Sequence, residues 1–249
     1  DGTVTAAKIA SGAVTTAKIA DANVTAAKIV SGADFTFNSV VVGKGANSVA
    51  GNTVLGEGAL DASVSGGNNV AIGKNALTNL TSGTKNTAVG QIALEDLTTG
   101  NSNCAIGSDA LKNTTTGDYN IAIGVDALAA NTTANQGIAI GYQALDVNTT
   151  GAKNVAIGTS ALGANTTADD NTAIGNAALL ENTTGADNVA IGAQALDANT
   201  TASENTAVGR QALTDNTTGT SNTAVGRMAL GNNTTADGNT AVGTDALFT

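Results

Sequence analysis

The sequence predicts an all-β protein, a parallel β-solenoid of about twelve coils with 17 residues in each coil. Three observations lead to this prediction. A glycine that follows Ile or Val, or Leu in the first copy, recurs at a fixed spacing of 17 from Gly56 to Gly243. Every later copy contains a stretch x-Ala-[Ile/Val]-Gly, which has the period of two of a short strand. Aromatic residues make up only 2% of the chain while glycine numbers 31, so a thin, regular structure is favoured over a globular core.

The repeating unit reads Asn-x-Ala-[Ile/Val]-Gly-x-x-Ala-Leu-x-x-Asn-Thr-Thr-[Gly/Ala]-x-x, and its positions are numbered here from the leading Asn, position 1, to position 17. A unit of this length is too short for a helical hairpin repeat, which needs about 33 residues or more. Gly, Asn and Thr in each unit also disfavour a helix and supply turns between strands. We therefore expect residues 52–249 to form the solenoid.

The chain before this array is organised differently. Residues 1–30 hold three copies of a ten-residue unit Val-Thr-x-Ala-Lys-Ile, which we expect to form a fibrous stalk by association between chains. Residues 31–51 are expected to join and cap the array, with Phe35 and Phe37 over the first coil, because an open solenoid end exposes strand edges and core. The one methionine is Met228 and the sequence stops inside a repeat, so we expect the chain to be a segment of a longer polypeptide.

Alternation along the short strand divides its side chains between two faces. We expect the Ile or Val at position 4, and the residue two before it, to point into the coil. The alanine between them is expected to point outward, where its constant small size suggests a closely packed partner. The expected core column is Ile72, Val89, Ile106, Ile123, Ile140, Ile157, Ile174, Ile191, Val208, Val225 and Val242. The expected interface column, which the resemblance given below places in a trimer, is Ala71, Ala88, Ala105, Ala122, Ala139, Ala156, Ala173, Ala190, Ala207, Ala224 and Ala241.

The charged residues follow the repeat closely. Between Asn69 and Thr249 there are 21 of them, and all fall at positions 6, 7, 10, 11, 16 and 17. Random placement would not spare the other eleven positions in every copy. The six positions are therefore predicted to be solvated corners, and the rest core, ladder or interface.

Several residue patterns suggest sites, and each has a structural alternative. Asn-Thr-Thr could be an N-glycosylation sequon, but its recurrence favours an Asn that turns the chain and stacks in a hydrogen-bonded ladder. The Thr-Thr pair also suggests ice binding as an alternative function. Because adjacent strand residues point to opposite faces, only one Thr per coil could join an outer array. Cys104 occupies the expected inward column and is predicted to be buried and inert. The in-register sequons are Asn131, Asn148, Asn165, Asn182, Asn199, Asn216 and Asn233.

Composition argues against several classes of protein. The chain has no histidine, the commonest general base and metal ligand, and Asp109, Asp126 and Asp245 recur too irregularly for a calcium roll. We therefore expect no enzyme activity, no cofactor and no metal. A net charge of −10 disfavours nucleic acid as a partner, and no apolar run reaches the roughly 18 residues of a membrane span.

The unit that begins at Asn154 and runs Asn-Val-Ala-Ile-Gly-Thr-Ser-Ala resembles the head repeat of trimeric autotransporter adhesins of the YadA type. That family forms a left-handed parallel β-roll with three chains side by side, in coils usually shorter than 17 residues. The longer Ala-Leu-x-x-Asn-Thr-Thr-Gly unit, with the Val-Thr-x-Ala-Lys-Ile decads, is similar to bacteriophage tail fibres, particularly those of marine and cyanobacterial phages. The resemblance covers nearly the whole chain and is specific for architecture but weak for biological role.

By this resemblance the chain would be the homotrimeric, non-catalytic shaft of a viral tail fibre that supports attachment to a host cell, and its alanine column would face the threefold axis. Its partners would be itself, other tail or baseplate proteins, and a host surface receptor, glycan or protein, bound through segments outside this chain. The location would be the virion tail. One alternative is a trimeric autotransporter-type adhesin head on a bacterial cell surface. The second alternative is a monomeric ice-binding solenoid.

Overall fold

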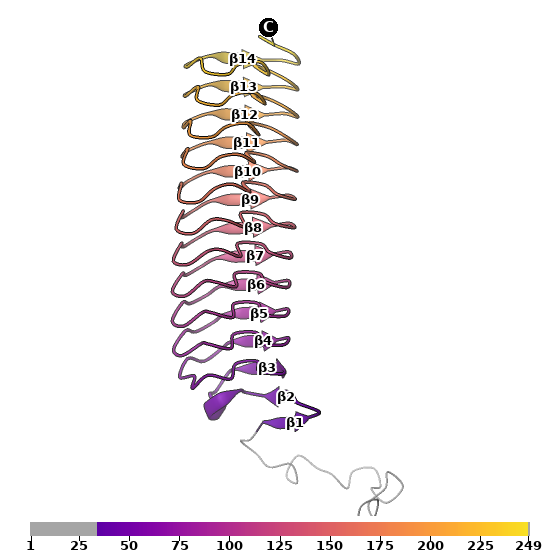
Figure 1. Cartoon of the computed structure of the whole chain (residues 1–249), viewed down its shortest axis with the longest axis vertical. Helices are drawn as coiled ribbons and strands as arrows, with labels where there is room; N and C mark the ends of the chain where they lie inside the picture. Colours follow the sequence, from indigo (N-terminus) through magenta and orange to yellow (C-terminus); the bar gives the residue numbers. More distant parts are fainter. Residues whose placement is uncertain (1–33, 249) are drawn as a thin grey trace, which may run out of the picture. The chain divides into compact units, whose positions relative to one another are not determined.

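The computed structural model describes residues 34–248, which build one column of stacked coils (Figure 1). The expected stalk, residues 1–30, lies outside the described residues. Fourteen strands form a single sheet in chain order within the described range. The strands are β1 (Phe35–Phe37), β2 (Val40–Gly43), β3 (Thr53–Gly56), β4 (Val70–Ile72), β5 (Thr87–Val89), β6 (Cys104–Ile106), β7 (Ile121–Ile123), β8 (Ile138–Ile140), β9 (Val155–Ile157), β10 (Thr172–Ile174), β11 (Val189–Ile191), β12 (Thr206–Val208), β13 (Thr223–Val225) and β14 (Thr240–Val242). A short 3-10 helix, η4, spans Ala46–Ser48.

The strands β3 to β14 pair in parallel, and each residue faces its counterpart 17 positions along the chain. Ala156 lies beside Ala173, for example, and Ile157 beside Ile174. The predicted parallel β-solenoid with 17-residue coils is therefore confirmed, and the column makes about eleven turns between the first and last of these strands. At the usual spacing of roughly 4.8 Å between strands, the stack from β3 to β14 is about 53 Å long.

Three residues in each coil adopt left-handed backbone conformations and turn the chain at the corners. In the coil that contains β7 they are Asp126, Leu128 and Gln136, with φ of 59°, 52° and 60°. The glycine that ends each strand has another special geometry. Gly158 has a φ of +133°, and a Cβ there would lie 2.5 Å from the carbonyl oxygen of Gly175 in the next coil. The regular recurrence of glycine thus reflects close contact between stacked backbones.

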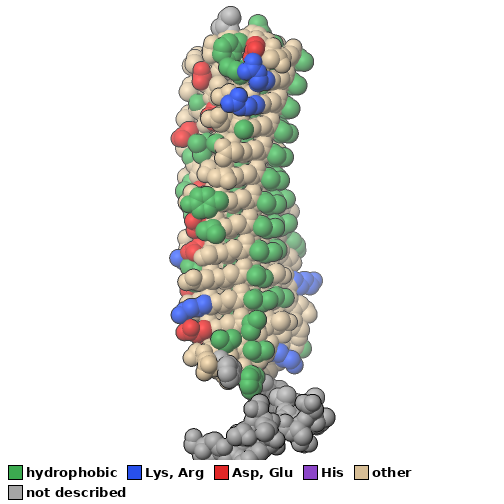
Figure 2. Space-filling model, turned by 90° about the vertical axis from the view of Figure 1, so that its right-hand side faces the viewer, with side chains coloured by type: hydrophobic (Ala, Val, Ile, Leu, Met, Phe, Trp, Pro, Cys, Tyr) green, Lys and Arg blue, Asp and Glu red, His purple; other side chains and the backbone are tan. Residues whose placement is uncertain are grey.

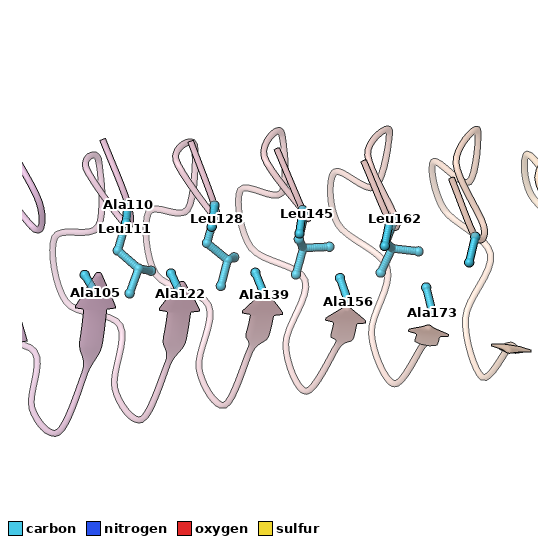
Figure 3. Packing of buried hydrophobic residues seen from close by; sticks show 14 of the residues in the cluster. Ala105, Ala110, Leu111, Ala122, Leu128, Ala139, Leu145, Ala156, Leu162 and Ala173 are labelled. Carbon is cyan, nitrogen blue, oxygen red and sulfur yellow. The ribbon is translucent and has the colours of Figure 1, made fainter. Parts of the chain in front are cut away.

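The apolar interior of the coils from β4 onward is built from two alanines and one leucine per coil, and the first coil has Val54 in place of the strand alanine. The strand alanines at position 3 are between 0 and 3% exposed, and they face the leucines at position 9 across the coil (Figure 3). These leucines are Leu60, Leu77, Leu94, Leu111, Leu128, Leu145, Leu162, Leu179, Leu196, Leu213 and Leu230, all at most 5% exposed.

The predicted assignment of the strand faces is therefore wrong. The column from Ile72 to Val242 points out of the coil, and the column from Ala71 to Ala241 points into it. The physical reason is the narrow interior of the coil, where the strand side chain packs against the leucine on the opposite side: the small alanine fills this space from β4 to β14, and in the first coil Val54 takes the same buried place. The constant small size of the alanines reflects close packing against the leucine of the same chain, not against another chain. The alanine column cannot form an interface with another chain.

Two columns of asparagine run through the interior and satisfy buried backbone groups. At position 1, the Oδ1 of Asn171 accepts hydrogen bonds from the backbone nitrogen and Nδ2 of Asn188, at 3.0 and 3.2 Å. At position 12, Nδ2 of Asn165 donates to Oδ1 of Asn148 at 2.8 Å. No buried side-chain nitrogen or oxygen in residues 34–248 lacks a hydrogen-bond partner, so the polar interior is compatible with burial.

The N-terminal end of the described column is covered by an antiparallel hairpin. Strand β2 pairs with β1 on one side and with β3 on the other, so it covers the free edge of the first parallel strand. The carboxylate of Asp34 accepts hydrogen bonds from the backbone nitrogens of Lys44 and Gly45, at 2.6 and 2.7 Å. Phe35, however, is 60% exposed, so the prediction that it plugs the first coil is wrong. The edge is covered by main-chain pairing instead.

Candidate interaction surfaces

The outward side of the sheet carries an apolar stripe, here called the strand face, made of positions 2 and 4 of each coil. Its position 4 column is Leu55 followed by the Ile and Val residues that had been predicted to form the core. Several of its members are well exposed, including Ile106 at 40%, Ile123 at 37% and Ile191 at 38%. Its position 2 column is Thr53, Val70, Thr87, Cys104, Ile121, Ile138, Val155, Thr172, Val189, Thr206, Thr223 and Thr240. The hydrophobic members follow the column from end to end (Figure 2).

Charged residues are absent from the strand face along the whole described stack, from Thr53 to Val242. They lie instead at the corners, and none of those in residues 34–248 is buried. The prediction of six solvated corner positions is therefore confirmed. Two of the corner columns, position 17 before each strand and position 6 after it, border the strand face on either side.

The Asn-Thr-Thr segment presents a second regular surface. At position 13 the threonine is half-buried in most coils, and its Oγ1 donates to the carbonyl of the next threonine in the column, as from Thr149 to Thr166 at 3.0 Å. At position 14 the side chain is exposed in every copy, so one hydroxyl per coil reaches solvent. From the second coil onward, this column of exposed hydroxyl groups consists of Ser82, Thr99, Thr116, Thr133, Thr150, Thr167, Thr184, Thr201, Thr218 and Thr235.

The asparagines of the sequons lie inside the coil, except Asn233 near the C-terminal end, which is half-exposed. From Asn131 to Asn216 they are 0% exposed, and Nδ2 of Asn182 donates to Oδ1 of Asn165 at 3.2 Å. The ladder interpretation is therefore confirmed, and the folded coil leaves no room for a glycan on these side chains.

Cys104 lies on the strand face, not in the core. It is half-buried, so the prediction that it is buried in an inward column is wrong. Desolvation by its apolar neighbours raises the pKa of its thiol, which keeps it protonated at neutral pH and lowers its reactivity.

Two open hollows lie near the two ends of the described column. One of about 320 Å³ lies at the last coils, between Leu230, Asn233, Asn239 and Leu247, and another of about 230 Å³ lies beside the hairpin. In residues 34–248 no group of three His, Cys, Asp or Glu side chains is placed to hold a metal ion. The same range contains no helix with the length and apolar character needed to cross a membrane.

Sequence reasoning missed the strand face and the leucine core. The signal for the core was present, because leucine at position 9 is the large apolar residue that follows an alanine in copy after copy. An alanine on one side of a narrow coil and a leucine on the other complement each other in volume, and this pairing could have placed the alanine inside.

Fold and surfaces together define a β-solenoid repeat protein whose regular outer columns are its candidate sites. Comparison of the chain with models of known families, with curated proteins and with solved structures gives no match. The repeat and the geometry of these columns are therefore the basis on which a function can be inferred.

Proposed function

We propose that the chain is the non-catalytic shaft of an attachment fibre, in which three copies lie side by side on a viral tail and hold a receptor-binding tip away from the particle. The observation that supports this proposal most strongly is the unbroken stack from β3 to β14. A column without a deep cleft, built from one unit repeated without insertion, is suited to a mechanical role.

The bonding between coils supports a stiff shaft. The junction between coils 154–170 and 171–187 has seven backbone hydrogen bonds outside the strands, distributed around the coil. They include Gly175 N to Ile157 O at 2.7 Å on the strand side and Leu162 N to Ala178 O at 2.9 Å on the opposite side. Bending the column would stretch bonds on one side at every junction, so bending is resisted along its whole length.

The test of this proposal is the mass of the purified chain in solution, measured by light scattering. A value near three times the chain mass of 24.0 kDa is expected, together with straight rods of uniform width in electron micrographs. A mass of 24.0 kDa at all concentrations would overturn the three-chain shaft.

A bacterial surface adhesin would use the same column differently, with the side of the solenoid itself bound to a host or matrix molecule. The sequence of the complete gene separates the two proposals. A tail-fibre tip or an intramolecular chaperone domain favours the phage shaft, and a C-terminal membrane-anchor barrel favours the adhesin.

One observation favours ice binding as a second candidate function. Position 14 is exposed and holds a hydroxyl in every copy from Ser82 onward, whereas the exposed corner positions vary freely. Regularly spaced hydroxyls with methyl groups suit contact with an ordered water lattice. Thermal hysteresis of the purified chain tests this function. Thr150→Lys with Thr167→Lys should abolish any hysteresis, and Glu181→Lys at a corner should leave it unchanged.

A further inference from the structure

We infer that the strand face is the surface through which copies of this chain pack together, around an axis parallel to the column. The inference depends on the proposed multi-chain shaft and names the surface that builds it. The alanine column is enclosed in its own coil, so the contact between chains must use another surface.

The apolar character and length of the strand face fit a second copy of the chain. Position 4 holds Leu, Ile or Val in all twelve parallel strands, and no charge interrupts either column. A strip of this length is at the upper end of the apolar patches that soluble monomers expose, and patches of that size are often functional. A parallel copy presents a strip of the same length and chemistry, which few other partners would do.

The area of the contact indicates that it reaches beyond the two columns. A three-residue strand is about 10 Å wide and the stack about 53 Å long, which gives a strip of roughly 530 Å². Stable interfaces bury about 800 Å² on each partner, so the bordering columns at positions 6 and 17 must join the contact. The largest exposed side chains of the central coils lie there. Tyr119 precedes β7 and is 61% exposed, Val125 follows β7 and is 45% exposed, and Tyr142 follows β8 and is 52% exposed.

The charges on these two borders are complementary near the C-terminal end. The border before the strands carries carboxylates at Asp170, Asp187 and Glu204, and the border after the strands carries both arginines of the chain, Arg210 and Arg227. Rotation about an axis parallel to the column places the position 6 border of one copy against the position 17 border of its neighbour. At the level of β12 opposite charges then meet between chains, whereas Asp170 and Arg227 already form ion pairs within the chain, with Lys153 and Asp245.

Two residue pairs on the same level illustrate this fit. Glu204 precedes β12 and Arg210 follows it, so the two residues lie on opposite borders of the same strand. Among the ion pairs of residues 34–248, none joins Glu204 to Arg210. Tyr119 and Val125 border β7 in the same way. In a parallel arrangement at equal height, Arg210 of one copy faces Glu204 of the next, and Val125 faces Tyr119.

Substitutions that respect the fold test this inference by sedimentation at a series of concentrations. The double variant Ile121→Thr with Ile138→Thr replaces two isoleucines of the strand face by threonine. Other coils already have threonine at this position, as at Thr172, so the variant should still fold. We expect association to weaken by roughly a hundredfold or more, because apolar contact area is lost at every chain. Glu181→Arg, at an exposed corner of position 11, is the matched control and should associate as the original chain does.

A charge exchange tests the arrangement of the copies. Arg210→Glu should weaken association by roughly three- to tenfold, and Glu204→Arg combined with Arg210→Glu should restore it. If the original chain is monomeric, the proposed shaft fails and the inference fails with it. If the chain associates but the isoleucine variant associates equally well, the shaft stands and the strand face is excluded. If the exchange does not restore association, the parallel arrangement at equal height is overturned.

Discussion

The two sides of each strand in this solenoid differ in how much variation they accept. The inward position is alanine in all eleven strands from β4 to β14, whereas the outward position 2 accepts Thr, Val, Ile and Cys. The inward side faces a leucine across a narrow interior, so a small side chain fits there in all parallel strands but β3, which has Val54. The outward side meets no such limit, and its preference for β-branched residues follows from strand geometry.

The backbone contact beside the strand should give the largest effect. Gly158→Ala would place a Cβ 2.5 Å from the oxygen of Gly175, at a φ of +133°. Neither backbone can move without disturbing its neighbours, so we expect a loss of at least about 3 kcal/mol in unfolding free energy. Urea denaturation followed by circular dichroism measures this loss.

Gly163→Ala is the matched control for this substitution. The added Cβ would lie 3.1 Å from the end of the flexible Leu180 side chain, and other coils have larger residues at the same position, such as Asp146 and Thr214. A change of less than about 0.5 kcal/mol is expected. Equal losses for the two variants would show that stacked glycines are not required by close contact.

The comparison of inner and outer columns can be tested directly at β9. Ala156→Val adds two methyl groups inside a closed coil and should cost about 1–3 kcal/mol in unfolding free energy. Ile157→Val on the outside should cost less than about 0.5 kcal/mol at concentrations where the chain is monomeric. Thermal unfolding of the two variants at low protein concentration measures both values. A larger loss for the outer variant would contradict the face assignment.

The architecture could be predicted from the sequence because it depends on spacing. A strict period of 17 with glycine at a fixed place, and charges confined to six positions, specify a stacked coil without any knowledge of side-chain direction. The assignment of faces could not follow from alternation alone. Alternation places Ala156 on one face of the strand and Val155 and Ile157 on the other, but it does not say which face is inside. Residue size alone favours the larger side chains for the core, and in this coil that preference gives the wrong face. The decisive quantity is the internal width of the coil, which depends on the corner conformations of residues such as Leu162.

One interruption of the interior offers a gain in stability. Gly137 stands in the position 1 ladder where the coils on either side have Asn120 and Asn154. Its backbone nitrogen donates to Oδ1 of Asn120 at 2.8 Å, but it has no side chain to continue the ladder. Gly137→Asn should restore the amide and raise the unfolding free energy by about 1 kcal/mol. Thermal unfolding measures this gain, and Asn188→Gly, which introduces the same interruption elsewhere, should lose a similar amount.

The smallest expected effect belongs to an outer corner. Ile92 has a φ of +52°, a conformation that a β-branched residue adopts only with strain, and its side chain is half-exposed. The same position holds Asn75 in the preceding coil, with a φ of 56°. Ile92→Asn should therefore raise the unfolding free energy by about 0.5 kcal/mol, because asparagine tolerates this conformation and little apolar area is lost. Denaturant unfolding of Ile92→Asn beside Ile92→Val measures the difference, since Val keeps the branched side chain and its strain. If both variants lose the same unfolding free energy, the packing of the Ile92 side chain stabilises this corner. The left-handed backbone conformation then does not decide which residue is favoured there.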